Sequence, residues 1–359
     1  MNKSYFRVDF GLLISALVLV ILGVSGIYSL NITLFKSQLI FLIGSLLAFF
    51  FFSQVNYQSI KIYSLPIYIT SIVLLVIVLI VGIESRGTVR WVEFFGFRIQ
   101  FSEILKPFLA LSLASFLTDK ESYAFRSFIV AILLILPIFM LIFLQPDLGN
   151  ALIYFITLLL VLFTFGFPIR YFIVFFATAM LFMPIFWDFL KVYQKQRIMT
   201  FLELKVDPLG SSYNAIQSVI AVGSGMVFGK GFGQGTQSVL RFLPERHTDF
   251  IFATLSEELG FVGASLMITA YFFLLYRILV IAREAKEKFI KVFAVCSFFL
   301  LAAQFFVNVG MNIGIVPIVG VSLPFVSYGG SSLLSSFILL GFLTSMGKYA
   351  ERKETLEIR

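Results

Sequence analysis

Residues 292–347 read VFAVCSFFLLAAQFFVNVGMNIGIVPIVGVSLPFVSYGGSSLLSSFILLGFLTSMG and contain no charged side chain. A transmembrane helix needs about 20 apolar residues, so this stretch is long enough for two. Its middle contains four residues that disfavour a continuous helix, Gly314, Pro317, Gly320 and Pro324. Proline removes a backbone donor and clashes with the preceding turn, and glycine marks loops. The stretch therefore predicts two membrane-spanning helices joined by an apolar loop.

Shorter uncharged runs, several of them long enough for one membrane helix, recur between the N-terminus and this stretch. The 359 residues are 60% hydrophobic and 13% charged, whereas a soluble chain carries about 25% charged residues. The polar side chains are too few to cover a water-facing surface. The sequence predicts an all-α polytopic membrane protein with a single transmembrane domain over 1–359. About ten helices are expected, near 10–30, 36–54, 62–83, 102–118, 125–144, 149–166, 169–187, 248–280, 289–314 and 325–347.

The lysines and arginines of the short loops predict the orientation of these helices. With the N-terminus in the cytoplasm, one set of basic residues faces the cytoplasm, as the positive-inside rule requires: Lys3, Arg7, Lys61, Lys120, Arg126, Arg170, Arg283, Lys286, Lys288, Arg352 and Lys353. An even number of helices then puts both termini in the cytoplasm. It also places a long extracytoplasmic segment, 188–247, between the seventh and eighth helices.

Basic residues also occur on the predicted outer side, where short loops are normally poor in them. Loop 83–102 carries Arg86, Arg90 and Arg98, and the long segment carries seven more lysines and arginines, including Lys230 and Arg246. Two explanations remain open. The cations contact lipid phosphates, or they bind an anionic ligand on the outer face.

The long segment also contains a glycine-rich stretch, residues 223–235 (GSGMVFGKGFGQG). It does not have the spacing of a phosphate-binding P-loop, because Gly231 follows Lys230 where serine or threonine is required. We expect a flexible loop or re-entrant segment whose glycines let the backbone approach a ligand closely.

Ionisable residues at membrane depth are candidates for function, because burying a charge in a bilayer is costly. Glu103 and Lys106 lie three residues apart at the start of a helix and can pair; a structural ion pair and a ligand-binding role are equally compatible. Asp147 and Asp249 each lie where a helix starts on the outer side, and helix capping is the simpler interpretation for both.

Glu257 and Glu258 lie deeper in the same predicted helix as Asp249 and must face the protein interior. Their roles stay open. His247 is the only histidine, so it cannot form a histidine metal cluster. The simpler interpretation is a polar residue at the membrane interface. Together these residues describe an outward cavity for an anionic amphiphile, without deciding whether the protein moves that molecule or modifies it.

Six motifs occur in an order that resembles one family. They are Arg90-Trp91, FSEILK at 101–106, QPDLG at 145–149, PERHTDFIFA at 244–253, EELG at 257–260 and LPFVSYGGSS at 323–332. The chain resembles the SEDS family (shape, elongation, division and sporulation) from about residue 10 to 348. GKGFGQGTQ at 229–237 is more similar to the rod-shape branch than to the division branch. The family often has arginine and proline where this chain has Val89 and Phe101, so Arg86 is expected to share the cationic role of Arg90.

The resemblance implies ten transmembrane helices and a peptidoglycan glycosyltransferase in the bacterial cytoplasmic membrane, with its active site facing outside. Such enzymes polymerise lipid II, an undecaprenyl-pyrophosphoryl disaccharide-pentapeptide, for cell elongation and rod shape. They act together with a class B penicillin-binding protein, and other proteins of the elongation complex are expected partners. Nucleic acid is not an expected partner, since the basic residues are scattered among loops.

Matched to this chemistry, Asp249 is the expected catalytic general base, because one carboxylate suffices to take the proton of the acceptor hydroxyl. The expected substrate-binding residues are Arg86, Arg90, Glu103, Lys106, Lys230, Arg246 and His247. A divalent cation near the phosphates is compatible with the reaction, but the spacing of the carboxylates does not establish one. The alternative function is a lipid II flippase, which needs the same cationic site and apolar groove but no catalytic carboxylate.

Overall fold

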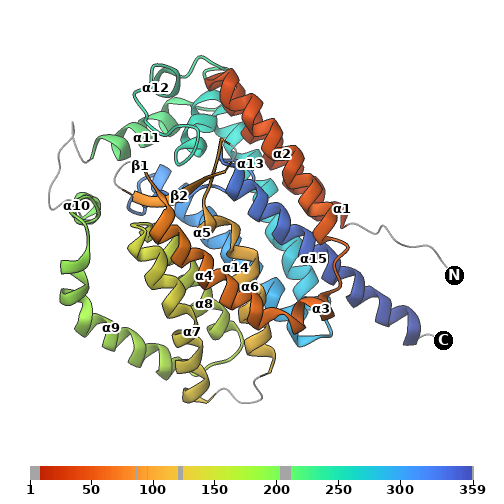
Figure 1. Cartoon of the computed structure of the whole chain (residues 1–359). Helices are drawn as coiled ribbons and strands as arrows, with labels where there is room; N and C mark the ends of the chain where they lie inside the picture. Colours follow the sequence, from red (N-terminus) through yellow and green to blue (C-terminus); the bar gives the residue numbers. More distant parts are fainter. Residues whose placement is uncertain (1–8, 86–87, 95, 120–123, 203–211, 358–359) are drawn as a thin grey trace.

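The computed structural model describes residues 9–85, 88–94, 96–119, 124–202 and 212–357. Ten apolar helices dominate this part of the chain (Figure 1). They are α1 (Phe10–Leu30), α2 (Ile32–Phe52), α4 (Ser64–Val81), α6 (Lys106–Thr118), α7 (Phe125–Leu144), α8 (Leu148–Thr164), α9 (Ile169–Phe189), α13 (Ile251–Glu284), α14 (Lys288–Asn312) and α15 (Gly330–Glu357).

Eight of the helices in the described ranges are long and apolar enough to cross a membrane, and α6 and α8 are shorter apolar helices. Together they coincide with the ten predicted spans, so the prediction of an all-α multi-pass membrane protein is confirmed. The bounds differ by several residues at some ends. The last helix begins at Gly330 rather than 325, because Pro324 to Gly329 form an irregular segment before it.

Shorter elements connect the apolar helices. They are α3 (Tyr57–Ile62), α5 (Phe101–Ile104), α10 (Val192–Phe201), α11 (Tyr213–Ser224), α12 (Thr236–Val239), β1 (Ile83–Ser85), β2 (Thr88–Phe94) and β3 (Phe97–Ile99). The three strands form an antiparallel sheet in the order β1-β2-β3. This sheet occupies the loop 83–102, for which the sequence predicted no strand, and the described residues of the long segment 188–247 include the short helices α10, α11 and α12.

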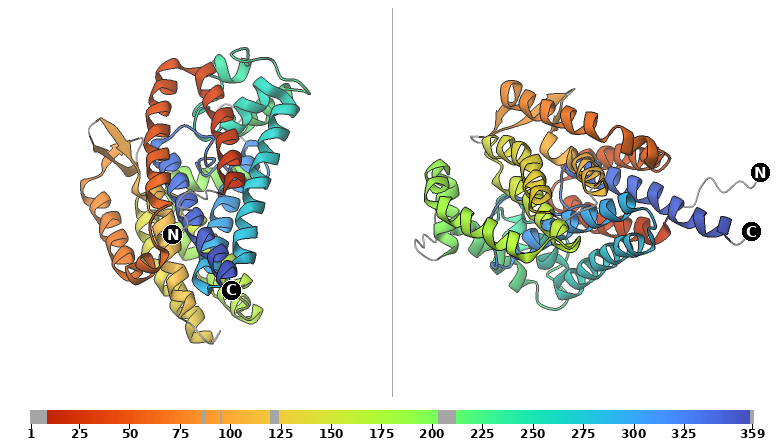
Figure 2. Two further views of the ribbon diagram at one scale, coloured as in Figure 1. Left: turned by 90° about the vertical axis from the view of Figure 1, so that its right-hand side faces the viewer. Right: turned by 90° about the horizontal axis from the view of Figure 1, so that it is seen from below.

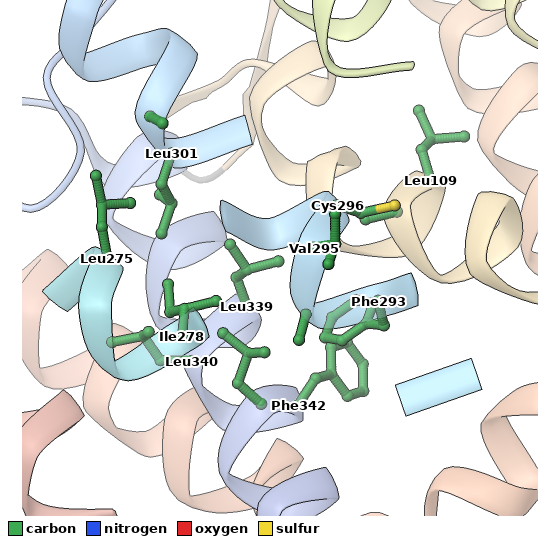
Figure 3. Close-up of a cluster of buried hydrophobic side chains, with 14 of the residues drawn as sticks. Leu109, Leu275, Ile278, Phe293, Val295, Cys296, Leu301, Leu339, Leu340 and Phe342 are labelled. Atoms are coloured by element: carbon green, nitrogen blue, oxygen red, sulfur yellow. The ribbon is translucent and has the colours of Figure 1, made fainter. Parts of the chain in front are cut away.

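Helices α14 and α15 are the most buried of the long apolar helices in the described ranges and form the centre of the bundle. α14 packs against α6, α8 and α13, while α2 lies along α15 and α1 lies along α13. Figure 3 shows the apolar side chains that meet there, among them Phe293 and Cys296 of α14, Ile278 of α13 and Phe342 of α15. Cys296 is fully buried, in agreement with an inert core residue.

Helix α9 differs from the other apolar helices because little of it packs against the rest of the protein. Phe172 is its one buried residue, and Figure 1 shows α9 and α10 running along the edge of the bundle. Large apolar side chains that remain exposed on a membrane helix are expected to face lipid.

The connections at one end of the bundle contribute the candidate site residues, and we call this the site end. It comprises the turn between α1 and α2, the sheet, the segment between α9 and α13, and the irregular segment 313–329. The start of α1 and the last turns of α15 lie toward the opposite end (Figures 1 and 2). An ion pair at that end, with Arg277 Nη2 2.7 Å from Asp9 Oδ2, joins α13 to the start of α1.

Candidate active site

Asp249 lies at the site end, two residues before α13 begins. Its half-buried side chain faces the segment 313–329, where Gly320 is so close that an added Cβ would lie 3.4 Å from Asp249 Oδ2. Burial is the main influence on this carboxyl group and raises its pKa to about 6. Arg90 and Arg197 act in the opposite direction, whereas Glu245 and Asp147 raise the pKa further. A carboxylate with this pKa is ionised at neutral pH and still basic enough to accept a proton.

Arg90 of β2 reaches toward the N-terminus of α8. Its Nη1 atom lies 3.8 Å from Asp147 Oδ1, and its guanidinium group lies 5.9 Å from the centre of the Trp91 ring. The Nε atom of Arg90 is buried and has no hydrogen-bond acceptor among the described residues. A buried donor without an acceptor is costly, so Arg90 keeps donor capacity for a ligand.

Asp147 is the N-cap of α8, since its Oδ1 atom accepts a hydrogen bond from Asn150 N at 3.4 Å. The capping that the sequence predicted is therefore present, but it is only part of what this carboxylate does. Its Oδ2 atom also accepts from the side chains of Gln100 (2.6 Å), Asn150 (2.9 Å) and Ser102 (3.2 Å). Asp147 thus joins α5 and α8 to the sheet and holds Arg90 beside Asp249.

The predicted pair Glu103–Lys106 forms, with Lys106 Nζ 2.7 Å from Glu103 Oε2. Both side chains are almost fully buried, at 7% and 2% exposure. A charge pair so far from solvent is costly to break. The geometry favours the structural interpretation of Lys106, although the pair adjoins Ser102 and hence the Asp147 cluster.

Arg246 and His247 lie on the turn before Asp249. Arg246 donates hydrogen bonds through Nη1 to the carbonyl oxygens of Ser238 and Val239, and burial followed by the charge of Arg241 lowers the pKa of its side chain. The His247 ring lies edge-on to Tyr328 at 5.5 Å. This turn and the α1–α2 turn enclose a cavity of about 260 Å³, lined by Leu30, Asn31, Leu34, Arg241, Leu243, Pro244, Glu245, Arg246 and His247.

Lys230 forms an ion pair with the buried Glu257 of α13, with Nζ 2.9 Å from Oε1. Glu257 also accepts hydrogen bonds from the backbone nitrogens of Gln237 and Ser238, and Glu258 accepts from Ser29 of α1 and from Gly233 N. These two glutamates attach the segment 229–238 to the bundle. This answers the question of their role that the sequence left open.

From the sequence we expected the glycine-rich stretch to approach a ligand. In the structure it approaches α13 instead. The α-helix is interrupted at Gly260, whose φ of 66° few other residues adopt. The freed backbone of α13 pairs with the stretch: Lys230 N donates to Glu257 O, and Phe261 N donates to Met226 O. The close approach is thus an internal contact between two backbone segments.

The structure places Arg90 within electrostatic reach of Asp249, and Arg246 and His247 lie on the turn that carries Asp249. Glu103, Lys106 and Lys230 form separate buried or half-buried pairs. Arg86 lies outside the described residues. Sequence reasoning did not single out Arg197 or Tyr193 of α10; Tyr193 donates to Pro146 O at 3.0 Å, and burial raises its pKa. The basic residues of 188–247 were the one signal for Arg197.

A metal ion would need oxygen ligands here, and Glu245 and Asp147 are the other carboxylates whose charges act on Asp249. Among the residues that the structure describes, no group of three or more His, Cys, Asp or Glu side chains could hold a metal ion. The divalent cation therefore stays a prediction.

Comparison with known proteins gives consistent matches over most of the chain. The family profile FTSW_RODA_SPOVE, described as cell cycle protein, matches residues 5–352. The peptidoglycan glycosyltransferase MrdB of Escherichia coli (strain K12) is 44% identical over 289 residues, 80% of this chain and 78% of its own length.

Two solved structures share the fold. One belongs to a study of structural coordination of polymerization and crosslinking by a peptidoglycan synthase complex; it gives a TM-score of 0.84 at 32% identity and covers 96% of this chain and 99% of its own. The crystal structure of the rod shape determining protein RodA from Thermus thermophilus gives 0.73 at 27% identity, covering 96% and 98%.

Proposed function

The chain belongs to the FtsW/RodA/SpoVE family of cell cycle proteins, and from this premise we propose that it is a peptidoglycan glycosyltransferase. Its substrate is lipid II, which it polymerises into glycan strands for cell elongation and rod shape. In the reaction the 4-hydroxyl of an acceptor sugar attacks the anomeric carbon of a donor. The bond from that carbon to the lipid pyrophosphate breaks, and the hydroxyl proton passes to a base.

The observation that carries this proposal is the half-buried carboxylate of Asp249 lying within electrostatic reach of Arg90 and Arg197. Asp249 is the general base: its pKa of about 6 keeps it ionised at neutral pH while leaving it able to take the acceptor proton. A flippase needs no such base, so a half-buried carboxylate of raised pKa favours catalysis.

Arg90 supplies positive charge to the departing pyrophosphate. The leaving group gains negative charge as the glycosidic bond breaks, and a cation already in place stabilises this charge without reorganisation. Arg90 is suited to the role because Asp147 orients it and its Nε atom has no acceptor among the described residues. Arg246 and His247, on the turn that carries Asp249, contact the sugars or phosphates of the second substrate.

We also propose a membrane placement for the protein and its site end. The protein is a multi-pass membrane protein, and we place it in the bacterial cytoplasmic membrane with the site end facing outside. The basic residues of the connections between the other helix ends then face the cytoplasm. A class B penicillin-binding protein, a transpeptidase, is the proposed partner, as the match to a complex for polymerization and crosslinking suggests.

Two assays test the proposed function. Purified protein with its transpeptidase partner should convert lipid II into glycan strands in detergent, where there are no two membrane faces. In sealed vesicles it should move no labelled lipid II between leaflets. Robust movement in vesicles, with no polymer in detergent with any partner or divalent metal, would instead establish the flippase.

A further inference from the structure

The backbone just before α13 is held by the segments that follow it in the chain. Three consecutive carbonyl oxygens accept hydrogen bonds from them: His247 O from Tyr328 N at 2.8 Å, Thr248 O from Ser327 Oγ at 2.7 Å, and Asp249 O from the side chains of Asn308 and Asn312, each at 3.0 Å. Both asparagines lie on α14, four residues apart, and both are fully buried. Residues four apart lie on the same face of a helix.

Asn312 makes a second contact that gives its amide a specific role. Its Nδ2 atom donates to Asp249 O, and its Oδ1 atom accepts from Ala253 N at 3.1 Å. In a regular helix the nitrogen of residue 253 would donate directly to the carbonyl of residue 249. The amide of Asn312 is inserted between these two groups and satisfies both of them.

Asn308 extends the same connection to the opposite wall of the site. Its Nδ2 atom donates to Asp249 O and also to Val321 O at 2.7 Å. Val321 follows Gly320, which lies against the Asp249 carboxylate. One side-chain amide thereby fixes the backbone that carries Asp249 and the backbone that faces it.

We propose that Asn308 and Asn312 are positioning residues for the glycosyl transfer: they hold Asp249 just outside the helix, at a fixed place relative to Gly320. This inference rests on the proposed role of Asp249 as the base. Insertion of the amide keeps Asp249 out of the regular helix without leaving buried backbone groups unpaired, which would be costly. A base must lie within hydrogen-bond distance of the proton that it takes, so a small displacement reduces turnover more than substrate binding.

The test compares Asn312→Ala and Asn308→Ala with the control Ser297→Ala. Ser297 is also buried on α14 and donates to Phe293 O within the same helix. We expect Asn312→Ala to lower kcat for lipid II polymerisation by about 100-fold, with KM within about threefold of wild type. Asn308→Ala should lower kcat by about tenfold, since Asn312 still holds Asp249, and Ser297→Ala should leave both constants unchanged.

A purely structural role would reduce the amount of folded protein and leave the kcat of the folded fraction unchanged, so active protein is counted by membrane yield and thermal unfolding. Wild-type kcat for the folded Asn312→Ala protein, or a rise in KM alone, would overturn the proposal. If Asn312→Ala does not accumulate, wild-type kcat for Asn308→Ala would overturn it. Asp249→Asn in the same assay separates the role of Asp249 as the base from the positioning role of the asparagines. If Asp249→Asn is active, the assignment of the base fails. If Asp249→Asn is inactive and Asn312→Ala is fully active, only the positioning role fails.

Discussion

The pKa of Asp249 predicts how polymerisation responds to pH. The ionised carboxylate is the form that accepts the proton, so activity is present above the pKa and is lost as the pH falls through about 6. For the free enzyme this pKa is reported by kcat/KM. An ordinary aspartate, with a pKa of 3.8, would leave the rate flat over the same range.

The pKa fixes the size of the effect. With a pKa of about 6, roughly 91% of the base is ionised at pH 7 and roughly 9% at pH 5, so kcat/KM should fall by about tenfold. With the ordinary pKa of 3.8, roughly 94% would still be ionised at pH 5 and the loss would be below about 10%.

The assay measures initial rates of glycan synthesis from lipid II in detergent between pH 5 and 8, at substrate concentrations below KM. Two variants test whether Asp249 is the group that titrates, because one removes a positive charge near it and the other removes a negative charge. Arg90→Gln removes a charge that lowers the pKa, so its midpoint should move up; Glu245→Gln removes one that raises the pKa, so its midpoint should move down.

A wild-type profile that is flat from pH 5 to 7 would refute the reasoning, provided that the protein remains folded at pH 5. Midpoints that do not move in the two variants, or that move in the reversed order, would show that another group is responsible for the titration.

Three further predictions concern the cations and buried pairs. Arg90→Ala should weaken lipid II binding by about 1.5–3 kcal/mol, as expected for a charge-assisted hydrogen bond to phosphate, and titration of lipid II would measure it; unchanged affinity and rate would assign Arg90 to lipid contact. Lys106→Ala should destabilise the protein by about 3–5 kcal/mol, since it leaves Glu103 buried and unpaired. The double variant Lys106→Ala/Glu103→Ala should unfold at a higher temperature than Lys106→Ala alone; an equal or lower temperature would contradict a stabilising ion pair between the two residues. Glu257→Ala should lower the melting temperature more than Glu245→Ala, because it removes the acceptor for Lys230 and for two backbone donors; equal values would contradict anchoring of the segment 229–238.

The apolar helices could be predicted from the sequence, because a bilayer requires long uncharged runs and such runs are visible in one dimension. Pro317 and Pro324 likewise indicated the break between the last two helices. The sheet at 83–99 was not predicted, because its strands are short and border the membrane, where the signal of alternating polarity is weak.

The residues of the candidate site could be predicted only in part, because the sequence marks charged side chains but not the contacts that they make. Asp249 and Arg90 stood out as charges beside apolar helices, and the structure places Arg90 within electrostatic reach of Asp249. Two partners of Asp147 could not be foreseen, because Gln100 and Ser102 lie 47 and 45 residues away in the sequence. Lys230 looked like a ligand for phosphate, but its partner Glu257 lies 27 residues away on another element. Neutral amides such as Asn312 give no signal in a search for charges.

Single-turnover polymerisation of lipid II by the Asp249→Asn variant, in complex with the transpeptidase partner, tests the central claim most directly. The substitution keeps the size of the side chain and removes its basicity. We expect a rate lower by about 10²–10⁴-fold, with normal membrane insertion and nearly unchanged affinity for lipid II. A folded Asp249→Asn protein that forms glycan strands at the wild-type rate would show that Asp249 is not the base and would contradict the mechanism.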